Sequence, residues 1–336
     1  MQPSMLAKIL NMPELPNYFD RVHKRMIGLV SNTNPLIKEP MLRLISGLDK
    51  RFVVFLVLPV AKSLGKNIDD SVISSCAILE LLNMAFCIHD DVTDNSNKRY
   101  GVPNINAVEG INQAILIGDY IINLTVQEAL AVSKEIADVV INSISENRES
   151  EIIEIADRYN LDRSIASYLN CIKLKSASHL SASCQIGGLC AGIPDGQIKA
   201  LAEYGSAVGM MYQLIDDLLD FVSTEQIMRK PIGKDVEEGV YTLPLLFALK
   251  STKNNRIKEL LSTKSKNSAA PCELYKILVS TGAIDKTIQE IKHQNQFAYD
   301  ALKDFEPNEV LSGLSSFSTY YTDMVLESHA DRLRGQ

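Results

Sequence analysis

The 336-residue sequence contains no tryptophan, and aromatic residues make up only 6% of it. This scarcity disfavours a core of β-branched and aromatic strands, so the 46% of hydrophobic residues must build a largely aliphatic core. The chain also lacks a Pro- or Gly-rich linker and any repeat with a period of about 20 to 50 residues. We therefore predict a single all-α domain over residues 1–336, folded as one large helical bundle.

Other absences exclude whole classes of function. The net charge is −7 and the basic residues are scattered, which argues against nucleic acid as a partner. The six cysteines form no CxxC pair and have no nearby histidine at zinc-ligand spacing, so we expect free thiols in a reducing compartment. The N-terminus lacks the apolar stretch of a signal peptide, and no apolar run reaches about 18 residues. We expect a cytoplasmic protein without a transmembrane segment.

Helical periodicity fills most of the chain. Residues 51–65 and 72–88 are apolar nearly all round, which is typical of the central helices of a large bundle. Residues 112–132 and 197–222 also show helical periodicity over several turns. Residues 166–192 are rich in Ser, Ala, Cys and Gly, which favours close helix packing or space for a ligand.

Two similar acidic motifs follow long apolar segments: DDVTD at residues 90–94 and DDLLD at residues 216–220. In a helix, positions i and i+4 share a face, so Asp90 pairs with Asp94 and Asp216 with Asp220. Each motif lies at the C-terminal side of its segment, where the helix dipole disfavours anions. Carboxylates about 4 Å apart repel by about 4 kcal/mol at an effective dielectric constant near 20. The alternative to a cation site is two solvated acidic helix ends.

Carboxylates without histidine or cysteine suit Mg²⁺, which often bridges protein to the phosphate oxygens of a substrate. If the two helices face each other, their carboxylates predict metal ions that clamp a diphosphate and neutralise it as a leaving group. Polar and cationic candidates for binding that diphosphate lie near both motifs in the sequence: Arg99, Lys175, Gln213 and Lys230.

Over residues 40–245 the sequence resembles the trans-isoprenyl diphosphate synthase family. The resemblance is carried, in order, by ELLNMAFCIHDDVTD, NQAILIGDY, KSASHLSASCQIGGLCAG, YQLIDDLLDF and KPIGKDVEEGVYTLP. It implies a helical bundle around a deep apolar cavity, a homodimer, and Mg²⁺-dependent ionisation of an allylic prenyl diphosphate.

The resemblance also assigns roles to individual residues. It implies that the Mg²⁺ ligands are Asp90, Asp94, Asp216 and Asp220, supported by Asp91 and Asp217. The groups similar to those that hold the allylic diphosphate are Arg99, Lys175, Gln213 and Lys230, with Ser176 where the family commonly has threonine. Lys50 and Arg51 match part of the family motif GGKRxRP, which holds isopentenyl diphosphate.

Four positions depart from the family pattern. At the isopentenyl diphosphate site, Val53 stands where the family has an arginine, Asn83 replaces a histidine and Tyr100 replaces a second arginine. Val240 replaces a lysine, and that loss touches the allylic site itself. A hydrogen bond to a charged group contributes about 1.5 to 3 kcal/mol, so three losses from the isopentenyl diphosphate site cost on the order of 3 to 8 kcal/mol. The sequence thus keeps the groups for ionisation and loses most of the second diphosphate site.

These departures favour a terpene synthase on a prenyl synthase fold, in which the carbocation cyclises, loses a proton or captures water. One alternative is chain elongation with isopentenyl diphosphate, or prenyl transfer to another acceptor. A third hypothesis is a binding subunit of a hetero-oligomeric prenyl synthase.

Phe86, four residues before Asp90, bears on the length of the substrate. In the resembling family, bulky residues here stop the growing tail, so Phe86 favours a C10 to C20 substrate. Ordinary core packing of Phe86 is the alternative.

Overall fold

The computed structural model describes residues 3–48, 52–99, 101–222, 233–251, 255–262 and 270–328. The fold is all-α and 81% helical, which confirms the predicted fold class. The chain divides into two compact units. Unit 1 comprises Met1–Ser145, His179–Gly205 and Ala301–Phe317, and unit 2 comprises Glu146–Ser178, Ser206–Asp300 and Ser318–Gln336. That the chain forms one domain stays a prediction.

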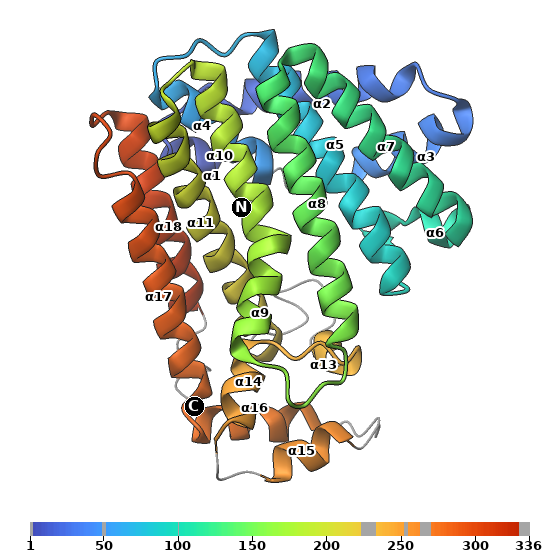
Figure 1. The fold of residues 1–336 in the computed structure, drawn as a ribbon, viewed down its shortest axis with the longest axis vertical. Helices are drawn as coiled ribbons and strands as arrows, with labels where there is room; N and C mark the ends of the chain where they lie inside the picture. Colours follow the sequence, from blue (N-terminus) through green and yellow to red (C-terminus); the bar gives the residue numbers. More distant parts are fainter. Residues whose placement is uncertain are drawn as a thin grey trace. The chain divides into compact units, whose positions relative to one another are not determined.

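The first part of the chain forms short and long helices and one two-stranded hairpin (Figure 1). Their bounds are α1 Pro3–Ile9, α2 Leu15–Ser31, α3 Pro35–Gly47, α4 Phe52–Ser63, α5 Asp70–Thr93, β1 Lys98–Arg99, β2 Val102–Pro103, α6 Ile105–Val108 and α7 Ile111–Val132.

The remaining elements are likewise helical, and helices α8, α11 and α18 pass from one unit into the other. Their bounds are α8 Lys134–Ala156, α9 Ile165–Ile172, η1 Lys173–Ala177, α10 Ser178–Ala191, α11 Asp195–Val222, α13 Lys234–Glu237, α14 Leu243–Leu249, α15 Asn255–Ser262, α16 Ala270–Ser280, α17 Ala283–Ala301 and α18 Glu309–Ser328.

Helix α5 is the centre of unit 1, and α2, α4 and α7 pack against it (Figure 1). The helix begins where Asp69 Oδ1 accepts hydrogen bonds from the backbone N–H groups of Ser71 and Val72. Fifteen of its side chains are buried, as expected for a segment that is apolar nearly all round. The prediction of a central helix over residues 72–88 is confirmed.

Helix α7 also lies in unit 1, but much of its apolar surface is exposed. By length and composition alone, α5 and α7 could each cross a membrane. The apolar window of α5 is 78% buried, as in the core helix of a folded unit, whereas that of α7 is only 28% buried. Cytoplasmic location and the absence of a membrane span therefore stay predictions.

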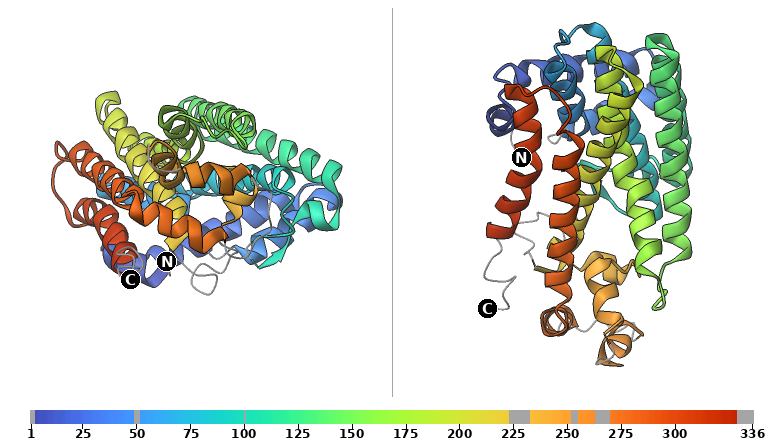
Figure 2. Two further views of the ribbon diagram at one scale, coloured as in Figure 1. Left: turned by 90° about the horizontal axis from the view of Figure 1, so that it is seen from below. Right: turned by 60° about the vertical axis from the view of Figure 1, so that its left-hand side comes forward.

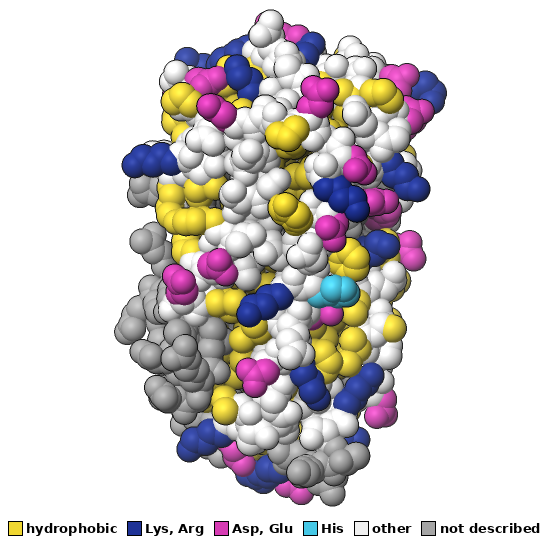
Figure 3. Space-filling view, turned by 90° about the vertical axis from the view of Figure 1, so that its left-hand side faces the viewer, with side chains coloured by type: hydrophobic (Ala, Val, Ile, Leu, Met, Phe, Trp, Pro, Cys, Tyr) yellow, Lys and Arg dark blue, Asp and Glu magenta, His cyan; other side chains and the backbone are white. Residues whose placement is uncertain are grey.

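In unit 2, the short helices α14, α15 and α16 pack on one another, and α14 also contacts α9 (Figure 2). Helix α17 runs beside the later part of α18 in both views, and Asn295 Nδ2 donates to Thr319 Oγ1 across this contact. On the face drawn in Figure 3, lysine and arginine side chains alternate with aspartate and glutamate and form no basic patch. That nucleic acid is not a partner stays a prediction.

Candidate active site

The first acidic motif ends helix α5 in unit 1. The helix ends at Thr93, and the backbone N–H of Asp94 still donates to the carbonyl oxygen of Asp90 at 2.8 Å. Asp90 and Asp94 are therefore one helical turn apart, as the i, i+4 spacing predicts, and both are partly exposed. Asp91 differs from them, because it is only 2% exposed.

Arg99 binds Asp91 rather than standing apart from the motif. Its Nε and Nη2 atoms both donate to Asp91 Oδ1, at 2.9 and 2.8 Å. Arg99 lies on β1, which pairs with β2 in an antiparallel hairpin, and Asn106 Nδ2 donates to the backbone oxygen of Asp91 at 3.2 Å. The loop after the motif is thereby fixed to the end of α5, with the guanidinium 31% exposed.

His89 precedes the motif and contacts α7. Its Nε2 lies 3.3 Å from Asp119 Oδ1 and 3.4 Å from the carbonyl oxygen of Ile115. Gly118 permits this approach, because a Cβ atom at that position would lie 2.6 Å from His89 Nε2. His89 therefore packs toward α7.

The second acidic motif lies within the last two turns of α11, in unit 2. Asp216 is partly exposed, whereas Asp217 and Asp220 are 3% and 4% exposed. Gln213 Nε2 donates to Asp217 Oδ1 at 2.8 Å, and the hydroxyl of Tyr168 donates to Asp217 Oδ2. Burial, opposed by these hydrogen bonds, raises the pKa of Asp217 to about 7. Burial also raises the pKa of Tyr168, so its hydroxyl stays protonated and can donate.

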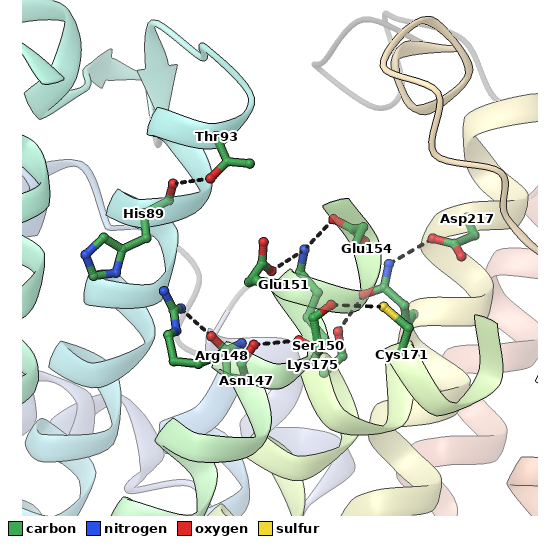
Figure 4. A network of polar contacts seen from close by, with 12 residues as sticks. His89, Thr93, Asn147, Arg148, Ser150, Glu151, Glu154, Cys171, Lys175 and Asp217 are labelled. Carbon is green, nitrogen blue, oxygen red and sulfur yellow. Dashed lines mark hydrogen bonds and ion pairs between the residues drawn. The ribbon is translucent and has the colours of Figure 1, made fainter. Parts of the chain in front are cut away.

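Lys175 lies in η1, a π-helical turn between α9 and α10, and such turns are frequent at functional sites. Its Nζ contacts Glu151 Oε1 at 2.7 Å and Glu154 Oε1 at 3.0 Å, both from the end of α8 (Figure 4). The ammonium group is thus held by two carboxylates of the same unit. Sequence analysis missed both glutamates, although their i, i+3 spacing places them on one helical face.

Ser176 joins the same polar network. Its Oγ donates to Gln213 Oε1 at 2.6 Å, so a chain of hydrogen bonds runs from Ser176 through Gln213 to Asp217. The approach of η1 to α11 depends on Gly209, where a Cβ atom would lie 2.5 Å from the Cα of Ala177. The structure thus brings together Ser176, Gln213 and the second motif, as the sequence predicts.

Phe86 lies inside unit 1, four residues before Asp90. It is 4% exposed, and its ring meets that of His179 edge to face with 5.5 Å between the centroids. His179 Nδ1 lies 3.3 Å from Ser143 Oγ, and burial lowers the pKa of this histidine to about 4. Phe86 therefore packs against a neutral imidazole.

Comparison with known proteins identifies the family. The polyprenyl synthetase family model matches residues 34–278. The chain belongs to the polyprenyl synthetase family. It is 32% identical over 305 residues to heptaprenyl diphosphate synthase component 2 from Bacillus subtilis, covering 90% of this chain and 86% of the relative.

The fold also resembles solved structures. A decaprenyl diphosphate synthase from Rhodobacter capsulatus matches with a TM-score of 0.86 and 24% identity, over 96% of this chain and 99% of that one. A polyprenyl synthase from Caulobacter crescentus, crystallised with calcium and isoprenyl diphosphate, matches with a TM-score of 0.82 and 23% identity. That alignment covers 94% of this chain and 96% of the other. At these identities the likeness shows the fold.

Several residues that the sequence analysis compares with the family motifs lie outside the described residues. These are Lys50, Arg51, Tyr100 and Lys230. Asn83 is described and is partly exposed on α5. Val240, where the family has a lysine, donates its backbone N–H to the Asp235 carbonyl oxygen at 2.7 Å.

The donor chemistry of the polyprenyl synthetase motifs fits Mg²⁺. Within the described part of the chain, no three acidic, histidine or cysteine side chains converge on one point at which they could hold an ion. Mg²⁺ usually keeps several waters and binds through one or two carboxylates together with substrate phosphates. Pairs such as Asp90 and Asp94 therefore suit an ion that arrives with a diphosphate. The assignment of the six aspartates as ligands stays a prediction.

Proposed function

We propose that this protein is a Mg²⁺-dependent prenyltransferase that joins an allylic prenyl diphosphate to isopentenyl diphosphate and so lengthens a prenyl chain. Membership of the polyprenyl synthetase family supports the proposal, as do the names of its relatives, which include heptaprenyl and octaprenyl diphosphate synthases. The observation that carries it is the polar network of unit 2, in which Ser176 and Gln213 connect η1 to the second acidic motif.

Each polar side chain of the site has a task in this reaction. Asp90, Asp94, Asp216 and Asp220 would hold the metal ions through carboxylate oxygens. When bound, Mg²⁺ would neutralise the negative charge that develops on the diphosphate as its bond to the allylic carbon breaks. Arg99, Lys175 and Gln213 would donate hydrogen bonds to the diphosphate oxygens, which fixes the orientation of the tail. The single O–H of Ser176 is used on Gln213 Oε1, so Ser176 would orient Gln213. The aliphatic core excludes water that would capture the carbocation.

Phe86 supports a short allylic substrate. This side chain is buried one turn before Asp90, and His179 packs against it. We expect this pair of buried rings to suit a C10 to C20 allylic substrate better than a long polyprenyl chain. The names of the heptaprenyl and octaprenyl diphosphate synthases describe the products of those relatives and do not set the chain length for this protein.

A second candidate is the terpene synthase hypothesis, in which ionisation is followed by cyclisation, elimination or water capture. Asn83 favours it, because asparagine cannot supply the charge of the histidine that the family pattern has at the isopentenyl diphosphate site. The comparisons favour chain elongation, since the relatives are named as heptaprenyl and octaprenyl diphosphate synthases.

We also propose a homodimer. In unit 1 the outer face of α7 exposes a row of large apolar side chains: Ile111, Ile115, Leu116, Tyr120 and Leu130. At about 100° of rotation per residue these five positions fall on one half of the helix, and a second copy of the chain would remove them from water. The Bacillus subtilis relative is named as component 2 of its synthase, so a different partner subunit is an outcome to be tested.

One panel of incubations tests the proposed function. The purified protein is incubated with Mg²⁺ and C10, C15 or C20 allylic diphosphate, each with and without isopentenyl diphosphate, followed by product analysis. We expect a longer prenyl diphosphate only where both substrates are present. A hydrocarbon or alcohol formed from the allylic substrate alone would replace elongation with the terpene synthase reaction. Activity that appears only after a second prenyl synthase subunit is added would favour the binding-subunit hypothesis.

The Asp94→Ala variant tests the first acidic motif, and Asp70→Ala is its matched control. It removes one predicted metal ligand from a partly exposed position at the end of α5, so the fold should survive. Asp70→Ala removes an equally acidic side chain in the first turn of the same helix. We expect the first variant to lose product formation and the second to keep it.

A further inference from the structure

The β1–β2 hairpin of unit 1, which carries Arg99, is too small to hold its own position. Each strand has two residues, and the register pairs Lys98 with Pro103 and Arg99 with Val102. A two-stranded hairpin alone is at best marginally stable in water. The placement of Arg99 therefore depends on contacts from outside the hairpin.

The contacts at the base of the hairpin are local. The backbone N–H of Asn104 donates to the carbonyl oxygen of Asn97 at 3.0 Å, and Asn104 Nδ2 donates to the carbonyl oxygen of Ser96 at 3.1 Å. Asn104 and Ser96 are only eight residues apart in the sequence, so these bonds fasten the loop to itself. An anchor on another element is needed to fix β2 against the rest of unit 1.

That anchor is Arg43, on α3. Its Nε donates to the carbonyl oxygen of Pro103, the last residue of β2, at 3.3 Å. Its Nη1 and Nη2 donate to Glu109 Oε1 and Oε2, at 2.8 and 2.7 Å, which is the two-bonded geometry that gives strong arginine–carboxylate pairs. We propose that Arg43 is a positioning residue: with Glu109 it holds the hairpin, and thereby Arg99, in place for the allylic diphosphate. The inference rests on the proposed function.

The clamp formed by Arg43 and Glu109 fixes both ends of the segment between β2 and α7. Glu109 directly precedes Gly110, whose φ of 91° lies in the left-handed region, and α7 begins at the next residue. Pro103, at the other end, has no N–H, so its carbonyl oxygen is its one backbone hydrogen-bonding group. Arg43 contacts both ends at once through a rigid, planar set of donors, which the ammonium group of a lysine does not have.

The effect reaches Arg99 through the register of the hairpin. Val102, which pairs with Arg99, is the neighbour of Pro103 in β2. A shift of β2 after the loss of Arg43 would therefore move Arg99 as well. Misplacing a binding group by about 1 Å can cost about 100-fold in rate. Arg43 thus acts through Arg99 rather than by its own contact with the substrate.

An ordinary ion pair of unit 1 provides the contrast. Arg25 Nη2 on α2 contacts Glu128 Oε2 on α7 at 2.9 Å, and the two side chains are 41% and 28% exposed. Exposed pairs of this kind contribute little to stability. The side chains of Arg43 and Glu109 are less exposed, at 26% and 16%. Arg25 is therefore the matched control, because its salt bridge includes no residue of the hairpin.

The test measures diphosphate binding by the full-length protein. Inorganic pyrophosphate is titrated at saturating Mg²⁺ by calorimetry, and KM and kcat are measured for a C15 allylic diphosphate in the presence of isopentenyl diphosphate. We expect Arg43→Met to weaken pyrophosphate binding about 10-fold and to raise the KM of the allylic substrate by a similar factor, with kcat changed less than about twofold. Arg25→Met should keep both the affinity and the KM within about twofold of the wild type.

A double-mutant cycle shows whether Arg43 acts through Arg99. In the Arg99→Met background, adding Arg43→Met should change pyrophosphate affinity less than about threefold. Glu109→Gln is the milder variant, because it keeps one carbonyl oxygen for the guanidinium. It should weaken pyrophosphate binding about threefold, and it tests the clamp even if Arg43→Met does not fold.

Two results would overturn the inference and leave the proposed function standing. One is wild-type pyrophosphate affinity in both Arg43→Met and Glu109→Gln. The other is an equal loss of affinity from Arg43→Met in the presence and in the absence of Arg99. A wild-type protein that binds no pyrophosphate and forms no longer prenyl diphosphate would overturn both the inference and the proposed function.

Discussion

The imidazole of His179 meets the ring of Phe86 edge to face, with 5.5 Å between the ring centres. Both side chains are more than nine-tenths buried, and Ser143 Oγ lies 3.3 Å from His179 Nδ1. This contact joins α5 and α10 inside unit 1. It places a titratable group against the side chain proposed to limit the length of the substrate.

Acid should destabilise the protein through His179. Burial lowers its folded pKa to about 4, below the value of about 6.5 in an unfolded chain. Between these two pKa values the unfolded chain binds a proton at His179 that the folded chain does not bind. The contribution of neutral His179 to the free energy of unfolding is therefore present above pH 6.5 and is lost as the pH falls toward 4. At pH 5 this group alone should cost about 2 kcal/mol.

Denaturant unfolding at pH 7.5 and pH 5 measures this cost. His179→Leu should lose about 2 kcal/mol less than the wild type over this interval, since the leucine does not titrate. His293→Gln is the control, because that side chain is 59% exposed, and it should keep the wild-type difference. Equal pH dependence in His179→Leu and the wild type would contradict the prediction.

Replacing Phe86 by alanine should lengthen the product. The truncation opens space one turn before Asp90 and costs about 3 to 5 kcal/mol of stability, as for other buried phenylalanines. Product analysis by mass spectrometry should show longer prenyl chains than the wild type makes. Phe19→Ala in α2 is the matched control, because Phe19 is also buried at 3% exposure, and it should be destabilised without a change in product length. An unchanged product in Phe86→Ala would leave Phe86 as ordinary core packing.

Local pattern was sufficient to predict the long helices. Helix α5 was predicted from an apolar run and α11 from its 3.6-residue period, and the i, i+4 spacing correctly placed Asp90 and Asp94 one turn apart. These are properties of residues near one another in the sequence, so a single segment contains the information.

Partners that are distant in the sequence could not be predicted in this way. The contact of Lys175 with Glu151 spans a loop and a change of helix, and nothing in either segment alone requires it. The bond between Tyr168 and Asp217 joins residues 49 positions apart. The π-helical turn at η1 was also missed, because its residues resemble those of an ordinary helix. The sequence therefore predicted candidate side chains, whose roles stay predictions, and left open which residues contact them.

Gly209 should not tolerate a side chain. A Cβ atom there would lie 2.5 Å from the Cα of Ala177 and 3.0 Å from the Ser176 carbonyl oxygen, and both are backbone atoms that cannot rotate away. Gly209→Ala should lower the free energy of unfolding by about 1 to 3 kcal/mol. It should also raise the KM for the allylic diphosphate, because η1 carries Lys175 and Ser176.

Gly196→Ala is the matched substitution in the same helix. No atom lies within 4 Å of a Cβ built at this position, so stability should stay the same or rise slightly. Thermal unfolding and steady-state kinetics of the two variants give the comparison. If both variants keep wild-type stability and KM, the close approach of η1 and α11 does not constrain the site.

Charge on the outer face of α7 should dissociate the proposed dimer. Leu116 is 67% exposed in the single chain, and burying such a side chain contributes about 1.5 to 3 kcal/mol. A two-fold axis repeats every substitution, so Leu116→Glu removes this contribution twice and brings two negative charges into the interface. Light scattering coupled to size-exclusion chromatography should report a dimer for the wild type and a monomer for Leu116→Glu.

Leu36→Glu is the control, because Leu36 is 68% exposed on α3 rather than α7. This substitution should leave the dimer intact. A wild-type monomer, or a Leu116→Glu dimer of unchanged affinity, would show that the apolar face of α7 does not bind a second copy.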